Sequence, residues 1–384
     1  MHILFKQQKK LTLFLLGGFS LLAGLMLIVT ATMGMFARAN DTPSMPAGAM
    51  TDGLPQISAG GIHSLAIDDT GMLWGWGLLV PNSSRITEPI EIGNKTDWAA
   101  IAAGEQHSLA LDEQGKLWAW GANNSGQLGN GTTESLFEPT MIQPTKTWKA
   151  IATGESHSMA IDEDGRLYTW GWNSRGQLGD GTTGNANNKH VPALIQSVKK
   201  WNSISAKGQL SAALDENNKL FTWGGNAGSV PTKRGDNTYT TILATSNDVH
   251  ALDNNSVYWY HQSGFNGFST ITDKWVTIAF VSGQTVTCLN NAGELYSFNA
   301  VTGNGVAVFT DKTWKPIFSS SGSHTMAVDS AGKLYTWGDN GSGQLGDGTY
   351  ARRDIPIEIM TLMQVQLYTV APPPDSGTGW ILVS

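Results

Sequence analysis

An internal repeat limits the fold more than any other feature of the chain. The 24 residues that begin at Trp98, WAAIAAGEQHSLALDEQGKLWAWG, align without a gap with those that begin at Trp148, WKAIATGESHSMAIDEDGRLYTWG. A third copy begins at Trp314 and carries one inserted residue. Repeats of this size indicate stacked supersecondary units, because one unit is too small to bury its own apolar face.

Seven units can be counted from the aromatic residue, usually the Trp of a Trp-Gly pair, that closes each one. It recurs at spacings of 44, 50, 53, 37, 38 and 39 residues. The positions are Trp76, Trp120, Trp170, Trp223, Tyr260, Phe298 and Trp337. Residues 108–112 and 116–120 alternate in polarity around a Gly-containing turn, which predicts a hairpin. A third strand is expected at the Pro that follows the hairpin, and a fourth at segments such as residues 100–102, so that a unit has four strands. The Pro residues are Pro89, Pro139, Pro192 and Pro356.

Four short strands in some 40 residues predict a propeller blade, and seven units predict seven blades. The composition agrees, with 45 Gly and 15 Trp but only 14% charged residues. We therefore expect an all-β, seven-bladed β-propeller over residues 54–370, after a linker at 40–53 and before a Pro/Gly-rich tail at 371–384. The hairpin from Ile57 and the strand of Pro356 are expected to share one blade and close the ring, with residues 364–370 as a competing closing strand.

The N-terminus follows another plan. Lys6, Lys9 and Lys10 precede an apolar run at residues 11–36, and Ala37-Arg38-Ala39 follows it. A basic start, an apolar stretch and a small-x-small tripeptide are typical of a secretory signal, although this run is also long enough for a membrane anchor helix. Residues 1–39 are therefore expected to be a signal peptide or signal anchor. The rest of the chain is expected outside the cytoplasm, whether secreted, periplasmic or anchored, and touching a membrane only through residues 11–36.

The net charge and the cysteine content limit which partners and which covalent links we expect. Without residues 1–39 the chain has 20 basic and 31 acidic side chains, a net charge of −11. An acidic surface repels phosphate backbones, so we expect no nucleic-acid binding. The single cysteine, Cys288, cannot form an intrachain disulfide and is expected to be buried. We expect a monomer.

One motif carries a family resemblance. Trp-Gly-x-Asn-x-x-Gly-Gln-Leu-Gly-x-Gly-Thr ends at residues 132, 182 and 349, and Gly-x-x-His-Ser or a close variant belongs to the same units. These residues resemble the regulator-of-chromosome-condensation (alpha-tubulin suppressor-like) repeat, here in a bacterial exported member. Units four to six depart from it: Lys207 and Leu210 replace the Gly and His, and no Gly-Gln-Leu-Gly follows until the last unit.

The resemblance implies a binding protein. The eukaryotic founder is a chromatin-bound nucleotide-exchange factor for a small GTPase, partners that an exported acidic chain would not meet. A secreted bacterial propeller of similar type inhibits β-lactamases through aromatic loops. We therefore expect a non-enzymatic scaffold for an unknown protein partner. The alternative function is that of an enzyme acting on extracellular glycans. A further alternative is nucleotide-exchange activity like that of the eukaryotic founder.

Several polar patterns imitate chemical sites. Equivalent histidines in different blades are spread around the axis, so we expect them to be buried and bonded to backbone rather than to a metal; they are His63, His107, His157 and His324. Residues 162–165 and 339–343 imitate calcium loops, and Asp68-Asp69 imitates a carboxylate pair, but turns need the same residue types. We expect no cofactor and identify no catalytic set.

Aromatic residues divide into two groups. One group precedes each closing aromatic by two positions and is expected to pack between blades: Trp74, Trp118, Tyr168, Phe221, Tyr296 and Tyr335. The other group lies in loops where the repeat requires no aromatic residue. Because loop aromatics often dominate recognition, this group is the predicted binding set: Phe137, Trp172, Phe265, Phe268 and Tyr350.

Overall fold

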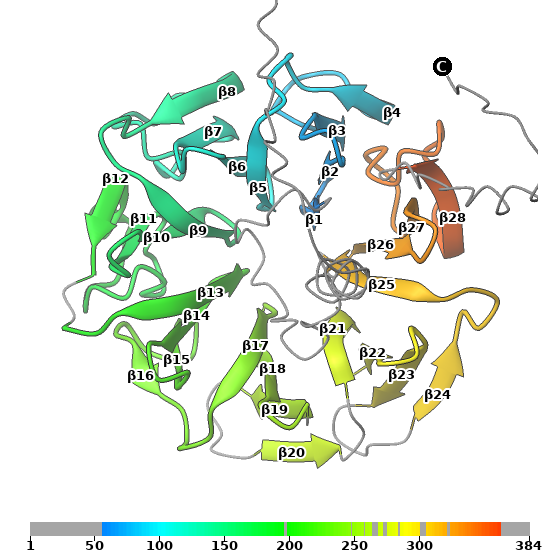
Figure 1. Ribbon diagram of the computed structural model, residues 1–384. Helices are drawn as coiled ribbons and strands as arrows, with labels where there is room; N and C mark the ends of the chain where they lie inside the picture. Colours follow the sequence, from blue (N-terminus) through cyan, green and yellow to red (C-terminus); the bar gives the residue numbers. More distant parts are fainter. Residues whose placement is uncertain are drawn as a thin grey trace, which may run out of the picture. The chain divides into compact units, whose positions relative to one another are not determined.

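The protein is described by a computed structural model that covers residues 56–195, 198–246, 248–256, 258–262, 268–271, 275–282, 285–299, 305–320 and 323–361. These residues form seven four-stranded antiparallel sheets, each with its strands in chain order. The sheets stand around a common axis, with the first strand of each innermost (Figure 1). The fold is an all-β propeller of four-stranded blades, and we number the sheets as blades 1 to 7.

The strands are short, as the repeat predicts. Blades 1 to 4 contain β1 (Gln56–Ala59), β2 (His63–Ile67), β3 (Leu73–Gly77), β4 (Ile86–Glu91); β5 (Trp98–Ala103), β6 (His107–Asp112), β7 (Leu117–Gly121), β8 (Leu136–Ile142); β9 (Trp148–Thr153), β10 (His157–Asp162), β11 (Leu167–Gly171), β12 (Lys189–Leu194); and β13 (Trp201–Lys207), β14 (Leu210–Asp215), β15 (Leu220–Gly224), β16 (Thr232–Lys233).

Blades 5 to 7 follow the same order. They contain β17 (Tyr239–Ala244), β18 (Asp248–Asp253), β19 (Tyr258–Gln262), β20 (Phe268–Ile271); β21 (Trp275–Ser282), β22 (Thr285–Asn290), β23 (Leu295–Asn299), β24 (Gly305–Val308); and β25 (Trp314–Ser320), β26 (His324–Asp329), β27 (Lys333–Gly338), β28 (Arg353–Thr361). The one helix among the described residues is a 3-10 turn, η1 (Asn185–Asn187).

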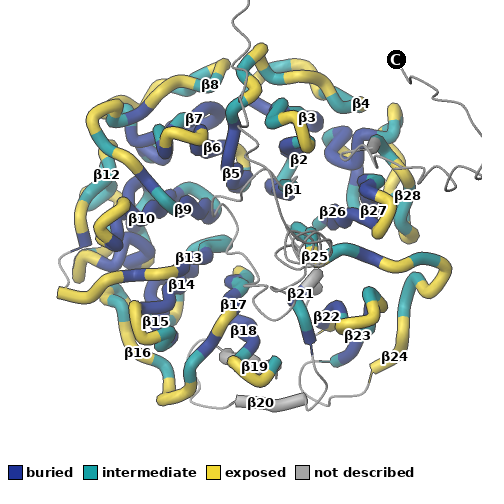
Figure 2. The backbone as a smooth tube through the Cα atoms, in the orientation of Figure 1, coloured by how far each residue is buried: buried dark blue, intermediate teal, exposed yellow. Residues whose placement is uncertain are grey.

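Burial follows the radius of the ring. The inner strands β5 and β6 are buried along their whole length, whereas the outer strand β8 is mostly exposed. Figure 2 shows the same gradient around the ring. Inner strands are covered on both faces by neighbouring blades, which explains their nearly continuous apolar sequences.

The predicted packing of aromatic residues between blades is confirmed. Tyr168 lies in an apolar cluster that joins blade 2 to blade 3. The ring of Tyr168 meets that of Trp148 edge to face at 5.0 Å, and the ammonium of Lys146 stands 4.4 Å from the Tyr168 ring. Lys95, Lys199 and Lys312 occupy the same place in blades 2, 4 and 7. In the sequence, a Lys stands two or three positions before the Trp that begins each of these units. The predictions above did not include this contact.

The expectation of a blade shared between the two ends of the repeat region is wrong. Residues 56–59 supply the first strand of blade 1, with Ile57 opposite Ala66 just as Ile101 lies opposite Ala110. The Pro356 segment belongs to β28, which pairs with β27 in blade 7. The strand β1 lacks the Trp with which β5 and β9 begin, so it is shorter, but the sheet of blade 1 has all four strands. Residues 364–370 lie outside the described residues.

Hydrogen bonds between blades 7 and 1 close the ring. The backbone N–H of Ala59 donates to Ser319 Oγ at 2.8 Å, and that of Ala103 donates to Ser58 Oγ at 2.9 Å in the joint between blades 1 and 2. The closing joint therefore repeats an internal joint. It is made by side chains between complete sheets rather than by strands of one mixed sheet.

The remaining expectations about the chain ends fall outside these residues. The described part of the chain holds no helix that is long and apolar enough to cross a membrane, and residues 1–39, 40–53 and 371–384 are not part of it. Cys288 is buried, as expected, and burial raises the pKa of its thiol.

Candidate functional site

One end of the ring carries two sets of loops. Because each blade is a consecutive antiparallel sheet, its first-to-second and third-to-fourth connections leave from the same end. We call this end the loop face. Among the loops that the structure describes in full, the inner ones are residues 60–62, 104–106, 154–156 and 208–209, and the outer ones are residues 78–85, 122–135, 172–188, 225–231 and 339–352.

The signature residues form joints between neighbouring blades. In blade 2, His107 Nε2 lies 3.0 Å from Ser158 Oγ of blade 3. The Ser158 hydroxyl donates to the carbonyl of Gln127 at 2.8 Å, and the Trp170 indole N–H donates to the same carbonyl at 2.8 Å. The Gly-Gln-Leu-Gly loop of one blade thus receives the Trp and Ser of the next blade.

The same joint occurs at two other places. His157, Ser211, Gln177 and Trp223 join blade 3 to blade 4 with distances of 2.9, 2.9 and 3.0 Å. His324, Ser64, Gln344 and Trp76 join blade 7 to blade 1 with distances of 2.7, 2.8 and 2.8 Å. The expectation that the motif histidines bond to backbone is wrong for His63, His107 and His157, whose partner is the serine hydroxyl of the adjacent blade.

The joint between blades 1 and 2 is incomplete. His63 Nε2 reaches Ser108 Oγ at 2.9 Å, but blade 1 has no Gly-Gln-Leu-Gly loop. The indole N–H of Trp120 consequently has no hydrogen-bond partner among the described residues. The joint therefore retains the His–Ser half of the arrangement and lacks the carbonyl half.

Burial keeps these histidines neutral. Desolvation lowers the pKa of His107, His157 and His324 to about 3, and that of His63 to about 4 with a further contribution from Lys207. Because the Ser158 proton is directed at Gln127, His107 Nε2 must donate, which leaves Nδ1 without a proton. A Cβ at Gly104 would lie 2.5 Å from the His107 ring, which explains the glycine of the motif.

The histidine positions do not converge on a metal. They lie in different blades, each bonded to its own serine. Within the ranges that the structure describes, no group of three or more His, Cys, Asp or Glu side chains is arranged to hold a metal ion.

The carboxylates that imitate catalytic or calcium sites accept hydrogen bonds within turns of the chain. Asp68 accepts hydrogen bonds from the backbone N–H of Thr70 and Met72 and from the Trp74 indole. These hydrogen bonds lower the pKa of Asp68 although partial burial raises it. Asp162 likewise accepts from the N–H groups of residues 164 and 166. In the other calcium-like segment, the Asn340 amide donates to Asp347 and ties the outer loop to itself.

The predicted binding aromatics do not form one patch. Phe137 at the start of β8 and Tyr350 before β28 are 68% and 54% exposed. Trp172 is half-buried and its indole N–H donates to Asn185 Oδ1 of the same loop at 2.8 Å. These three residues belong to blades 2, 7 and 3, of which only 2 and 3 are adjacent (Figure 1). Phe265 lies outside the described residues, and Phe268 is placed in β20 by its backbone alone.

Blade 4 departs from the joint in a coordinated way. Leu210 occupies the histidine position, and Val249 of blade 5 occupies the serine position that would face it. Both side chains lie in one buried apolar cluster. The polar pair has been replaced by an apolar pair, so the interface remains satisfied although the motif is lost.

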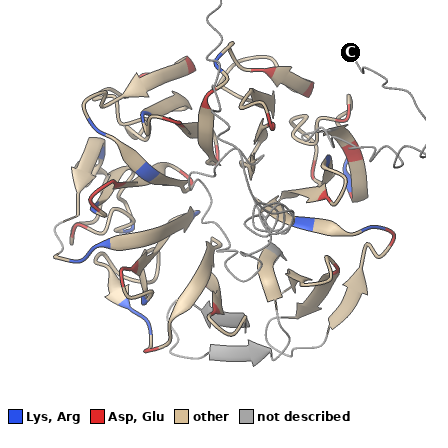
Figure 3. Cartoon of the chain, viewed as in Figure 1, with Lys and Arg blue, Asp and Glu red and all other residues tan. Residues whose placement is uncertain are grey.

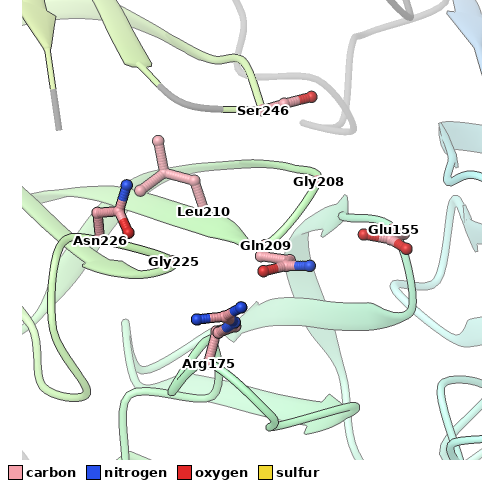
Figure 4. Close-up of a pocket in the computed structure, with 8 residues that line it drawn as sticks. All are labelled: Glu155, Arg175, Gly208, Gln209, Leu210, Gly225, Asn226 and Ser246. Atoms are coloured by element: carbon pink, nitrogen blue, oxygen red, sulfur yellow. The ribbon is translucent and has the colours of Figure 1, made fainter.

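A cavity of about 290 Å³ lies on the loop face beside this altered joint (Figure 4). It is lined by Glu155, Arg175, Gly208, Gln209, Leu210, Gly225, Asn226 and Ser246. None of these residues was in the predicted set. The available signal was Arg175, which stands where the other two motif loops have Ser125 and Ser342.

Comparison with protein families agrees with these joints. The regulator of chromosome condensation (RCC1) repeat matches residues 114–161, 164–214 and 331–371, and a second model of this repeat matches residues 98–127 and 148–177. The protein therefore contains RCC1 repeats within a propeller of four-stranded blades. The matched segments include all three complete joint loops. No curated protein sequence matches the chain.

Solved structures share the fold at low sequence identity. Prp20p from Saccharomyces cerevisiae is 17% identical with a TM-score of 0.66, covering 83% of this chain and 88% of its own. Human WBSCR16 is 16% identical with a TM-score of 0.65, covering 75% of this chain and 94% of its own. The ectodomain of the Arabidopsis thaliana receptor kinase ACR4 is 14% identical with a TM-score of 0.54, covering 82% and 100%. Such identities show the fold alone.

Proposed function

We propose that the protein is an exported, monomeric, seven-bladed scaffold that binds a protein partner through its loop face and is not an enzyme. One observation carries the proposal: the motif side chains are used inside the ring, whereas Phe137 and Tyr350 expose large aromatic surface at the loop face. Exposed aromatic rings lose little conformational entropy on binding and are enriched at binding hot spots. A ligand-independent structural role does not require them.

Two solved neighbours support this use of the fold. The Prp20p structure is described with its binding properties to Gsp1p and histones, and the ACR4 structure is the ectodomain of a receptor kinase. Charged residues in our protein are scattered around the ring rather than gathered in one sector of the view in Figure 3. Recognition by shape and aromatic contacts therefore suits this surface better than recognition of a polyanion.

Quantitative affinity capture tests the binding proposal. The tagged full chain and the variant Phe137→Ala/Trp172→Ala/Tyr350→Ala are compared on envelope and medium fractions of the producing cell. We expect a partner that the triple variant loses by at least about tenfold, with the free energy of unfolding changed by no more than about 1–2 kcal/mol.

The matched control removes equally exposed apolar surface elsewhere. Val306→Ala/Ile355→Ala changes two outer-strand side chains that are each 66% exposed. This control should retain the partner. Equal capture by the triple variant and the wild type would refute the role of the aromatic residues.

Export is tested separately. The signal at residues 1–39 predicts that the chain leaves the cytoplasm, and N-terminal sequencing of the mature protein distinguishes cleavage after Ala39 from a retained anchor. Recovery of the full chain only from the cytoplasm would contradict the proposal.

A further inference from the structure

The cavity between blades 3, 4 and 5 lies where blade 4 departs from the motif. In blades 2, 3 and 7 the outer loop carries Gly-Gln-Leu-Gly, and its carbonyl is held by the next blade. The outer loop of blade 4 is residues 225–231, which lack this sequence. Gly225 and Asn226 of this loop line the cavity, and Leu210 replaces the histidine beside them. The cavity therefore lies beside a joint that lacks the Gly-Gln-Leu-Gly loop found in the complete joints.

Two side chains of opposite charge line this space. Arg175 and Glu155 both face the cavity, with the Gln209 amide between them in Figure 4. Neither charged group forms an ion pair or side-chain hydrogen bond within the described residues. Only the backbone N–H of Arg175, which donates to Gln177 Oε1 at 2.8 Å, fixes the position of its loop.

Arg175 is exposed, and apart from the exposed Arg85 the other arginines of the described residues have recorded side-chain partners. Arg166, Arg352 and Arg353 form ion pairs with aspartates, and Arg234 donates to a threonine hydroxyl and a carbonyl. Arg175 has such a partner neither in its loop nor across the cavity among the described residues. Because Ser125 and Ser342 serve at the equivalent positions, the joint itself does not require a cation there.

Neutral polar groups complete the lining. The side chains of Gln209, Asn226 and Ser246 also have no hydrogen-bond partner within the described ranges, and all three line the same cavity. Amides and hydroxyls can donate and accept, so they suit a ligand that carries both kinds of group. A few convergent polar groups in a concavity are typical of small-molecule sites.

We propose that this cavity binds a small zwitterion, namely a free α-amino acid or a short peptide, with its carboxylate at Arg175 and its ammonium group at Glu155. The guanidinium matches a carboxylate in planar geometry, and the carboxylate of Glu155 complements an ammonium. The volume of about 290 Å³ is at the small end of ligand sites and fits one or two amino-acid residues. Phe137 and Tyr350 belong to blades that do not line this cavity, whereas Trp172 shares the outer loop of blade 3 with Arg175.

Isothermal titration calorimetry on the full chain tests the proposal with defined probes. L-Alanine and L-alanyl-L-alanine represent the two sources of the zwitterion. N-acetyl-L-alanine lacks the ammonium group, and L-alanine amide lacks the carboxylate. We expect at least one zwitterion to bind at millimolar concentration or below, and each blocked analogue to bind at least about tenfold more weakly.

Variants locate the binding. Arg175→Ser introduces the residue found at the equivalent position of blades 2 and 7, and Glu155→Gln removes one charge with little change in shape. Each is expected to weaken zwitterion binding at least about tenfold. Arg85→Ser, which removes an exposed arginine outside the cavity, is expected to leave binding unchanged.

Two results would overturn the proposal. One is the absence of binding by both zwitterions at millimolar concentration to protein whose thermal unfolding shows that it is folded. The other is binding that Arg175→Ser and Glu155→Gln leave within a factor of about two of the wild type. Equal protein capture by the aromatic triple variant and the wild type counts against the scaffold function alone, because calorimetry measures zwitterion binding without the protein partner, so the two failures are distinguishable.

Discussion

At the scale of single residues, the histidines of the motif are structural groups whose chemistry is set by burial. His107, His157 and His324 each donate from Nε2 to a serine of the next blade, and desolvation holds them neutral. A protonated imidazole at this position would carry an uncompensated charge into the core. The motif therefore makes the stability of the protein sensitive to acid.

The direction in which stability changes with pH follows from the lowered pKa values of the histidines. Above the ordinary pKa of 6.5 the full stability is present, and between 6.5 and about 3 the unfolded chain binds protons that folded His157 does not. Stability should therefore fall as the pH is lowered through this window, by up to about 1.4 kcal/mol per pH unit for each such histidine.

Urea denaturation between pH 7 and pH 4 measures the effect. His157→Gln should lower stability at pH 7 but give a shallower loss toward acid than the wild type, because one titrating group is gone. His190→Gln changes an exposed histidine and serves as the control. An unchanged slope in His157→Gln would contradict the prediction.

At the scale of elements, the outer loop works as a clamp whose shape depends on glycine. Gly129 has a φ of +75° and its missing side chain leaves room for the indole of Trp170. A Cβ there would lie 2.8 Å from Trp170 Nε1. The loop and the hairpin of the next blade are therefore fitted to each other.

A matched pair of glycine variants separates this fit from backbone strain. Gly131 has a similar φ of +85°, but a Cβ there would meet only a Val191 methyl at 3.8 Å. Both Gly129→Ala and Gly131→Ala should destabilise by about 1 kcal/mol through the positive φ. Gly129→Ala should cost at least about 1 kcal/mol more, measured by urea denaturation, because it also displaces the indole. Equal losses would show that the contact is unimportant.

At the scale of the whole molecule, the joint between blades 7 and 1 has the same hydrogen bonds as the joint between blades 2 and 3. Ser64 bridges His324 and the Gln344 carbonyl, just as Ser158 bridges His107 and the Gln127 carbonyl. A closed ring has no terminal repeat, so every joint resists unfolding of the whole. An open array would instead unfold from its ends.

The ring predicts equal effects at the closing and internal joints. Ser64→Ala and Ser158→Ala should each cost about 1–3 kcal/mol, because each leaves a buried histidine N–H without a partner. Thermal unfolding followed by Trp fluorescence and by circular dichroism should remain one coincident transition in both variants. A negligible cost for Ser64→Ala beside a clear cost for Ser158→Ala would indicate that the ends are open.

The sequence by itself determined the architecture. The spacing of Trp76, Trp120 and Trp170 and the polarity of the hairpins predicted four-stranded blades, because each unit must bury its apolar faces against its neighbours. The same pattern predicted the burial of the motif histidines and the packing between blades of the aromatic that precedes each closing aromatic by two positions. These properties depend on local periodicity, which can be detected in the sequence alone.

Tertiary structure alone decided what lies across each blade boundary. The Ser158 hydroxyl as partner of His107, the Leu210–Val249 replacement and the complete first blade all depend on pairing between units. The cavity at Arg175 and Glu155 lies where three consecutive blades meet and one of them lacks the Gly-Gln-Leu-Gly loop. His107 and Ser158 are 51 positions apart and Glu155 and Ser246 are 91 apart, so no pattern within one repeat specifies these contacts between blades.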